Sequence, residues 1–66
     1  MKLTALQKVI LDKVIKGETN IEIGVDIGYS ADTVKRQIRK LFKKFRVDKR
    51  IDLVREATVL KVKGLL

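Results

Sequence analysis

The sequence predicts an all-α fold of four helices, and three observations favour it. Two capping boxes mark helix starts, because Thr4 and Thr19 are each followed three residues later by Gln or Glu. Apolar residues recur at helical spacing along most of the chain. The 66 residues contain no Pro, whereas the good helix formers Leu, Lys, Arg and Gln are plentiful.

The first helix is predicted over residues 5–16, directly after the capping box at Thr4. Its apolar stripe is built from residues spaced by four and from their neighbours: Leu6, Val9, Ile10, Leu11, Val14 and Ile15. Gly17 follows at the position where a helix ends in the left-handed conformation.

The second helix is predicted over residues 20–27, although the stretch NIEIGVDIG alternates apolar and polar residues as a half-buried strand does. The capping box at Thr19 favours a helix, and a lone strand among helices would have no partner. A short helix clasped on two sides would bury both of its apolar faces. Gly24 would cost about 1 kcal/mol relative to Ala in a helix interior, which indicates a second helix crossing close to it.

The third helix is predicted over residues 31–45, with Gly28 in the preceding turn and Ser30 as its N-cap. Its apolar residues form a single stripe with a period of 3.6 residues: Val34, Ile38, Leu41, Phe42 and Phe45. Lys and Arg occupy the opposite side, so the stripe should face the core and the cations should face outward.

The fourth helix is predicted over residues 49–62, with Asp48 as its cap and Gly64 after its end. Its apolar residues cover more of the circumference than one core contact needs: Ile51, Leu53, Val54, Ala57, Val59, Leu60 and Val62. We therefore expect a second apolar contact on this helix.

Composition excludes several classes of function. The chain has neither Cys nor His, which excludes disulfides, thiol nucleophiles, histidine bases and the usual zinc sites. A domain of this size leaves little room for a catalytic cleft, so we expect no enzyme, no cofactor, no metal and no small-molecule substrate. No apolar run approaches the roughly 20 residues that span a bilayer, so we expect no membrane association and a cytoplasmic location.

The net charge of +8 is distributed unevenly. Residues 1–33 carry four Lys and five acidic residues, a net charge of −1, whereas residues 34–66 carry twelve Lys or Arg and three acidic residues, a net charge of +9. Between Thr33 and Val47 there are seven basic residues and no acidic one. A basic helical face is often only solvated, but this acid-free run favours a polyanionic partner.

The order of a short helix, a Gly-containing turn and a longer basic helix predicts a central helix-turn-helix. In this motif the second helix lies in the major groove of DNA, where Lys or Arg near its N-terminus reads guanine. Geometry therefore selects Lys35, Arg36 and Arg39 as base-contacting residues. The start of this helix and the more distant basic positions would meet phosphates instead. The residues assigned to phosphates on this ground are Thr33, Lys40, Lys43 and Lys44.

Residues 3–57 resemble the LuxR/GerE DNA-binding domain, and the match covers nearly the whole chain. The pattern of that family is roughly L-T-x-R-E-x-E-V-L, then G-x-S-N-K-E-I-A, then I-S-x-x-T-V-K-x-H, then K-L-x-V-x-x-R-x-x-A-V. The most specific matches are Gly17 with residues 20–23, Ser30 with residues 33–35, and Val47 with Arg50.

The resemblance implies a bacterial transcription regulator in which residues 1–66 form one helix-turn-helix domain that binds double-stranded DNA as a two-fold dimer. Base contacts in the family come from the three positions that geometry selects here. Positions that approach the DNA backbone match Asn20, Thr33 and Lys43, and we assign Ser30 and Arg50 to the same phosphate-contacting set.

The fourth helix makes the dimer contact in this family, which would account for its apolar surplus. We place the interface of the expected homodimer at Val54, Ala57, Thr58 and Lys61. RNA polymerase or another regulator is a further expected partner. Because Met1 precedes the first capping box by only three residues, the chain resembles the stand-alone members, which carry no upstream sensor domain.

The chain departs from the pattern of the family at several positions. The charged Arg-Glu-x-Glu near the start is Leu6-Gln7-Lys8-Val9 here, so we expect apolar packing to replace the polar ties of the first helix. The small Ala of the second helix is Gly24, and the His of the recognition helix is Gln37.

Three alternatives remain for the function. Region 4 of a sigma factor is also a promoter-binding helix-turn-helix, and residues 22–46 would suit it. The segment VDKRIDLVREA discriminates, because region 4 ordinarily ends soon after its recognition helix. A small protein that binds a regulator by imitating its DNA-binding domain is the second, although a mimic need not keep the three base-contacting cations. A membrane-surface helix is the third, and the two capping boxes favour a folded globule over it.

Overall fold

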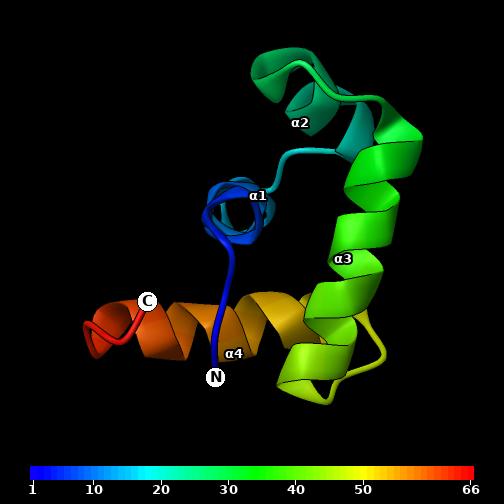
Figure 1. Ribbon diagram of the computed structural model, residues 1–66. Coiled ribbons are helices and arrows are strands. Elements are labelled where there is room, and N and C mark those ends of the chain that lie inside the picture. The colour runs from blue at the N-terminus through cyan, green and yellow to red at the C-terminus, as the bar shows by residue number, and fades with distance from the viewer.

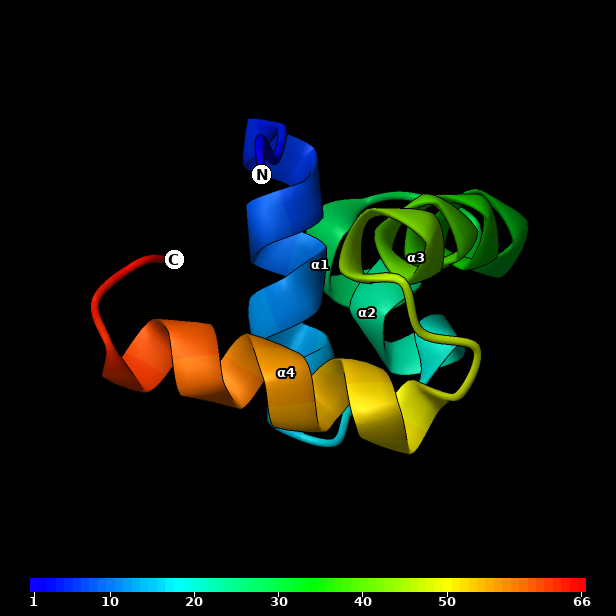
Figure 2. The same ribbon diagram turned by 90° about the horizontal axis from the view of Figure 1, so that it is seen from below.

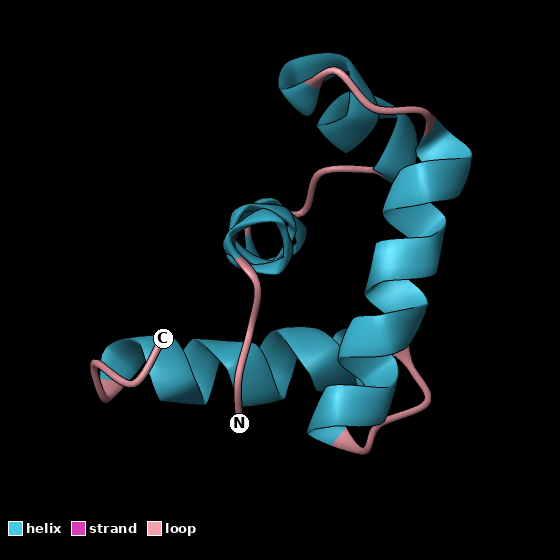
Figure 3. Ribbon diagram, in the orientation of Figure 1, coloured by secondary structure: helices cyan, strands magenta, loops and turns pink.

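The computed structural model describes all 66 residues and consists of four helices joined by short loops (Figure 1, Figure 3). The helices are α1 (Ala5–Ile15), α2 (Asn20–Ile27), α3 (Ala31–Phe45) and α4 (Arg50–Val62). The predicted all-α fold is confirmed, and each predicted helix has a counterpart whose ends differ from the prediction by at most one residue. No helix is both long enough and apolar enough to cross a membrane.

The helix α3 is the common packing partner of the other three helices. Figure 1 shows α2 near the beginning of α3 and α4 near its end, with α1 viewed along its axis between them. The turned view shows α4 crossing α1 (Figure 2). All four helices contribute to one buried apolar core: Ile10, Leu11, Val14, Ile23, Val34, Ile38, Leu41, Leu53 and Ala57.

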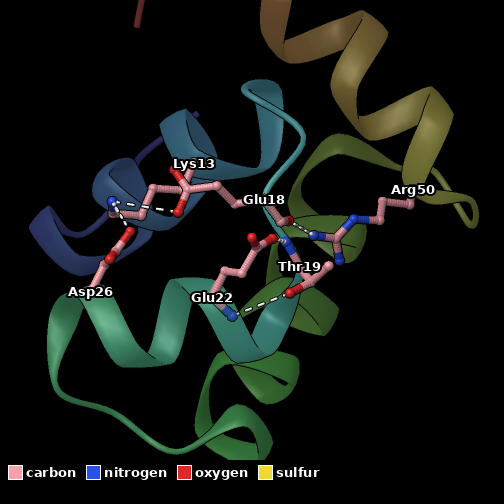
Figure 4. Close-up of polar contacts among 6 residues, drawn as sticks. All are labelled: Lys13, Glu18, Thr19, Glu22, Asp26 and Arg50. Carbon is pink, nitrogen blue, oxygen red and sulfur yellow. Dashed lines mark hydrogen bonds and ion pairs between the residues drawn. The ribbon is translucent and has the colours of Figure 1, made fainter.

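Reciprocal hydrogen bonds fix the starts of α1 and α2, as the capping boxes predict. The Thr4 side chain accepts from the Gln7 amide, and Gln7 Oε1 accepts from the Thr4 amide, both at 3.1 Å. Thr19 and Glu22 form the same pair of bonds at 3.2 and 2.8 Å (Figure 4). These bonds satisfy amides that a helix start leaves without a partner.

The beginning of α4 differs from the prediction, since its N-cap is Lys49 and no side chain caps it. Arg46 turns left-handed with φ 55°, and the Val47 amide donates to the Phe42 carbonyl at 3.0 Å. This tight closure of α3 sets the path of the chain and places Asp48 one residue too early to serve as the N-cap. The prediction that Asp48 caps α4 is wrong.

The strand-like alternation of α2 reflects a helix that buries a single face. Ile23 is fully buried and Ile27 is half-buried, so these residues form the inner face. Ile21 and Val25 are 70% and 78% exposed. The expectation that α2 is clasped on two sides, with both apolar faces buried, is therefore wrong.

Gly24 is required by the turn that follows α2. A Cβ at this position would clash with the backbone carbonyl oxygen of Tyr29. The Gly24 carbonyl accepts from the amides of Gly28 and Tyr29 at 2.9 and 3.0 Å, so the turn folds back over this residue. The expected close neighbour, a crossing helix, is thus replaced by the turn itself. Gly28 ends α2 with a left-handed φ of 76°.

Candidate nucleic-acid interface

The N-terminus of α3 lies at the surface, directly after the turn that follows α2. Ser30 is the N-cap, and its hydroxyl oxygen accepts from the Thr33 amide at 3.1 Å. The same hydroxyl donates to Thr33 Oγ1 at 3.0 Å. The first turn of α3 is therefore held in one conformation, with Ser30 exposed and Thr33 half-buried beside it.

The outer face of α3 brings the three predicted base-contacting residues together. Lys35, Arg36 and Arg39 are all exposed, and with Asp32 they surround one shallow hollow. A second hollow on the same face has no hydrophobic lining, and its lining residues are Thr33, Arg36, Gln37, Arg39, Lys40 and Lys43. Arg36 and Arg39 border both hollows, so they lie at the centre of the basic face.

The cations of this face have no acidic partner within the chain. The ion pairs of the protein lie elsewhere: Lys13–Asp26, Lys13–Glu18, Arg55–Asp52 and Lys61–Asp12. None of them involves a basic residue of α3. A row of unpaired Lys and Arg side chains favours a partner that carries closely spaced negative charges, such as the phosphates of a nucleic acid.

Lys44 differs from the other basic residues of α3. Its ammonium group donates to the Lys2 carbonyl at 2.7 Å and to Gln7 Oε1 at 2.6 Å. The side chain therefore lies against the N-terminal segment and ties the end of α3 to the start of α1. The sequence assigns Lys44 to phosphate contacts, whereas two of its three donors are engaged inside the protein.

Arg50 and Asn20, which the sequence assigns to phosphate contacts, bind one another, and Figure 4 shows Arg50 reaching Glu18. The guanidinium of Arg50 donates to Asn20 Oδ1 and to the Glu18 carbonyl, each at 2.8 Å. These bonds join the first residue of α4 to the first residue of α2 and to the loop before α2. No periodicity or motif in the sequence signals this pairing, because it depends on a contact between residues 30 positions apart.

A second polar link joins α1 to α2. Lys13 Nζ lies 3.0 Å from Asp26 Oδ2 and 3.7 Å from a carboxylate oxygen of Glu18 (Figure 4). The hydrogen bond to Asp26 raises the pKa of Lys13, and the same bond lowers the pKa of Asp26. Both groups are thus charged at neutral pH, and Lys13 lies between the carboxylates of Asp26 and Glu18.

Gln7 provides a polar tie that the sequence analysis missed. It is only 3% exposed, and its Nε2 donates to Gln37 Oε1 at 3.3 Å while its Oε1 accepts from Lys44. The expectation that apolar packing alone would replace the charged residues of the family at this position is therefore wrong. The capping box signalled the local role of Gln7, but nothing in the pattern signalled its contact with α3.

The residues assigned to a dimer interface on α4 have mixed surroundings. Ala57 is fully buried in the core of its own chain, and Lys61 Nζ pairs with Asp12 of α1 at 3.0 Å. Val54 is half-buried, and Thr58 is exposed with its hydroxyl bonded to the Val54 carbonyl. The exposed apolar residues of this helix are others: Ile51, Val59 and Val62, at 66%, 42% and 82% exposure.

Together these features define a class of protein. A short helix, a tight turn and a longer helix with an unpaired basic face make up a helix-turn-helix DNA-binding domain. A family model described as bacterial regulatory proteins, luxR family, matches residues 1–61, and the chain belongs to this family. It is therefore a DNA-binding transcription regulator by family. None of the curated proteins and none of the solved structures compared with the chain matches it.

Proposed function

We propose that this protein is a sequence-specific regulator that places α3 in the major groove and binds two half-sites as a homodimer. The observation that carries the proposal is the outer face of α3, where exposed cations without acidic partners surround Arg36 and Arg39. The proposal assigns base reading to Lys35, Arg36 and Arg39, because they stand near the N-terminus of the helix.

Phosphate contacts are assigned to the residues around this reading group. Ser30 and Thr33 lie at the helix start, where backbone amides favour an anion. Lys40 and Lys43 extend the basic face toward the end of α3. Asn20, Lys44 and Arg50 already donate or accept hydrogen bonds within the chain. In this proposal they set the positions of the helices, and only their remaining donors and acceptors contact DNA.

The homodimer is proposed to form through the outer face of α4. Ile51, Thr58 and Val62 lie on one side of this helix, opposite the buried residues Leu53 and Ala57. Two such faces can pack on each other across a two-fold axis, which would place two copies of α3 on one side of the DNA. RNA polymerase or another regulator would be a partner of the DNA-bound dimer.

The first experiment is selection from a pool of random duplexes by the purified protein at two salt concentrations. We expect an enriched palindrome whose half-sites lie about one helical turn apart. No enrichment, together with loss of all binding at the higher salt, would contradict sequence-specific regulation and leave only a basic surface.

Substitutions on α3 test the separate roles of its cations. Arg36→Ala and Arg39→Ala should each cost about 1–3 kcal/mol of discrimination between the selected site and a mismatched one. Lys43→Ala should weaken binding to all duplexes alike and lower the salt slope by about one. Titrations of matched and mismatched duplexes over a salt series measure both quantities. If the three variants behave identically, the assignment of base readers is wrong.

The dimer is tested by Ile51→Glu, which places a charge on the proposed interface. The control is Ile21→Glu on α2, since Ile21 is about equally exposed and the change of charge is the same. Sedimentation on the palindrome at limiting protein should show two copies bound together for the control and a single bound copy for Ile51→Glu. Equal behaviour of the two variants would remove α4 from the interface.

A further inference from the structure

The hydrogen bonds of Gln7 determine which end of the Gln37 side chain faces outward. Gln7 Oε1 lies within reach of two donors, the Thr4 amide at 3.1 Å and the Lys44 ammonium at 2.6 Å. Since neither donor can accept, this atom must be the carbonyl oxygen, and the other end of the amide must be the Nε2 donor. Gln7 Nε2 then requires an acceptor, and Gln37 Oε1 fills that role at 3.3 Å.

This assignment leaves the Nε2 group of Gln37 unpaired. It makes no hydrogen bond within the chain, whereas the carbonyl end is held by Gln7. Gln37 is half-buried and lines the same hollow as Arg36 and Lys40 on the basic face. The Nε2 group of Gln37 is therefore a free hydrogen-bond donor beside the residues that are proposed to contact DNA.

We propose that Gln37 contacts DNA through its Nε2 group, and that Gln7 is the positioning residue that holds it in this orientation. The proposal deepens the proposed function and rests on it. In the family's pattern these positions carry Glu and His, and here both are Gln. The pair thus keeps one donor and one acceptor in contact without a charge, and it presents a donor to phosphate oxygens or to the acceptor atoms of a base edge.

Gln7→Glu tests the orientation without removing the side chain. The carboxylate would still accept from Thr4 and Lys44, but it could not donate to Gln37. The Gln37 amide would then rotate so that Nε2 donates to Glu and Oε1 faces the DNA. An acceptor that faces acceptors is unfavourable, so affinity for the selected duplex should fall by about tenfold.

Lys8→Gln is the matched control, because Lys8 is the exposed neighbour of Gln7 and its loss lowers the net charge by the same amount. We expect Gln7→Glu to bind about tenfold more weakly than Lys8→Gln. In a Gln37→Ala background, which lacks the Gln37 amide, the same two substitutions should have equal effects. A loss of affinity that comes only from a less stable Gln7→Glu protein would appear in both backgrounds, so the Gln37→Ala background separates it from loss of the contact.

Repeating the duplex selection with Gln7→Glu identifies the DNA group that is contacted. A change of preference at one base pair toward adenine or cytosine, which offer an amino donor, indicates a base edge. An unchanged preference with uniformly weaker binding indicates a phosphate. Either result, with the tenfold difference, supports the contact.

Two results would overturn the proposal while the unsubstituted protein still selects its palindrome. One is equal binding by Gln7→Glu and Lys8→Gln. The other is a deficit of Gln7→Glu that persists in the Gln37→Ala background. Failure of the unsubstituted protein to select any sequence is a different outcome, because it contradicts the proposed function itself.

Discussion

Gly24 shows how one residue controls the approach of the two helices of the DNA-binding motif. Its missing side chain allows the Tyr29 carbonyl oxygen to lie over α2, and its own carbonyl accepts the amides of Gly28 and Tyr29. The turn is therefore pressed against α2 just before Ser30 begins α3. Any side chain here would push the turn, and with it the start of α3, away from α2.

We predict that Gly24→Ala lowers the free energy of unfolding by about 1–3 kcal/mol, because overpacking against a backbone atom outweighs the helix propensity of Ala. Urea denaturation measures the change. Ile21→Ala on the exposed side of the same helix is the control, and it should change stability by less than about 0.5 kcal/mol. A Gly24→Ala protein that is more stable than the parent would show that the turn moves away from the added methyl group with little loss of free energy.

Gln7 illustrates the difference between what local pattern and tertiary contact reveal. Its position three residues after Thr4 predicts the capping box, and the structure confirms it. The same side chain also meets Gln37 and Lys44, which lie 30 and 37 positions away. Spacing along one helix cannot predict such partners, because they depend on how α3 packs across α1.

At the scale of helices, the sequence predicts more of the structure than it does at single residues. Periodicity and capping residues locate all four helices, since these signals are local to each segment. The missed features arise between segments. The exposed side of α2 and the burial of Ala57 depend on which neighbours a helix has, and the loss of the Asp48 cap depends on how tightly α3 closes.

The uncapped start of α4 leads to a second prediction. Lys49 offers no acceptor to the first amides of the helix, and its charge opposes the positive end of the helix dipole. Lys49→Ser should therefore raise the free energy of unfolding by about 1 kcal/mol. Lys63→Ser, which removes the same charge at the other end of α4, is the control and should not stabilise. A thermal unfolding midpoint for Lys49→Ser at or below that of the parent would contradict the prediction.

For the molecule as a whole, the net charge of +8 makes salt act in opposite directions on folding and on binding. The unpaired cations of α3 repel one another in the free protein, and salt screens that repulsion. Raising salt from about 50 mM to about 200 mM should therefore raise the thermal unfolding midpoint of the free protein while it weakens the DNA complex. Calorimetry and binding titrations on the same samples measure both effects. A fall of the midpoint would show that the ion pairs outside α3 dominate the response.

Because α3 belongs both to the core and to the proposed DNA-binding face, binding to DNA should lengthen the lifetime of the protein. Val34, Ile38 and Leu41 belong to the core, while the opposite side of the same helix is the proposed reading surface. An unfolded chain therefore cannot bind specifically, and DNA at a hundred times its dissociation constant would stabilise the folded form by about 2.7 kcal/mol. Proteases that act on the unfolded chain would then degrade the protein about a hundredfold more slowly than in the absence of DNA. In a cell, the number of binding sites would set how much of this regulator persists.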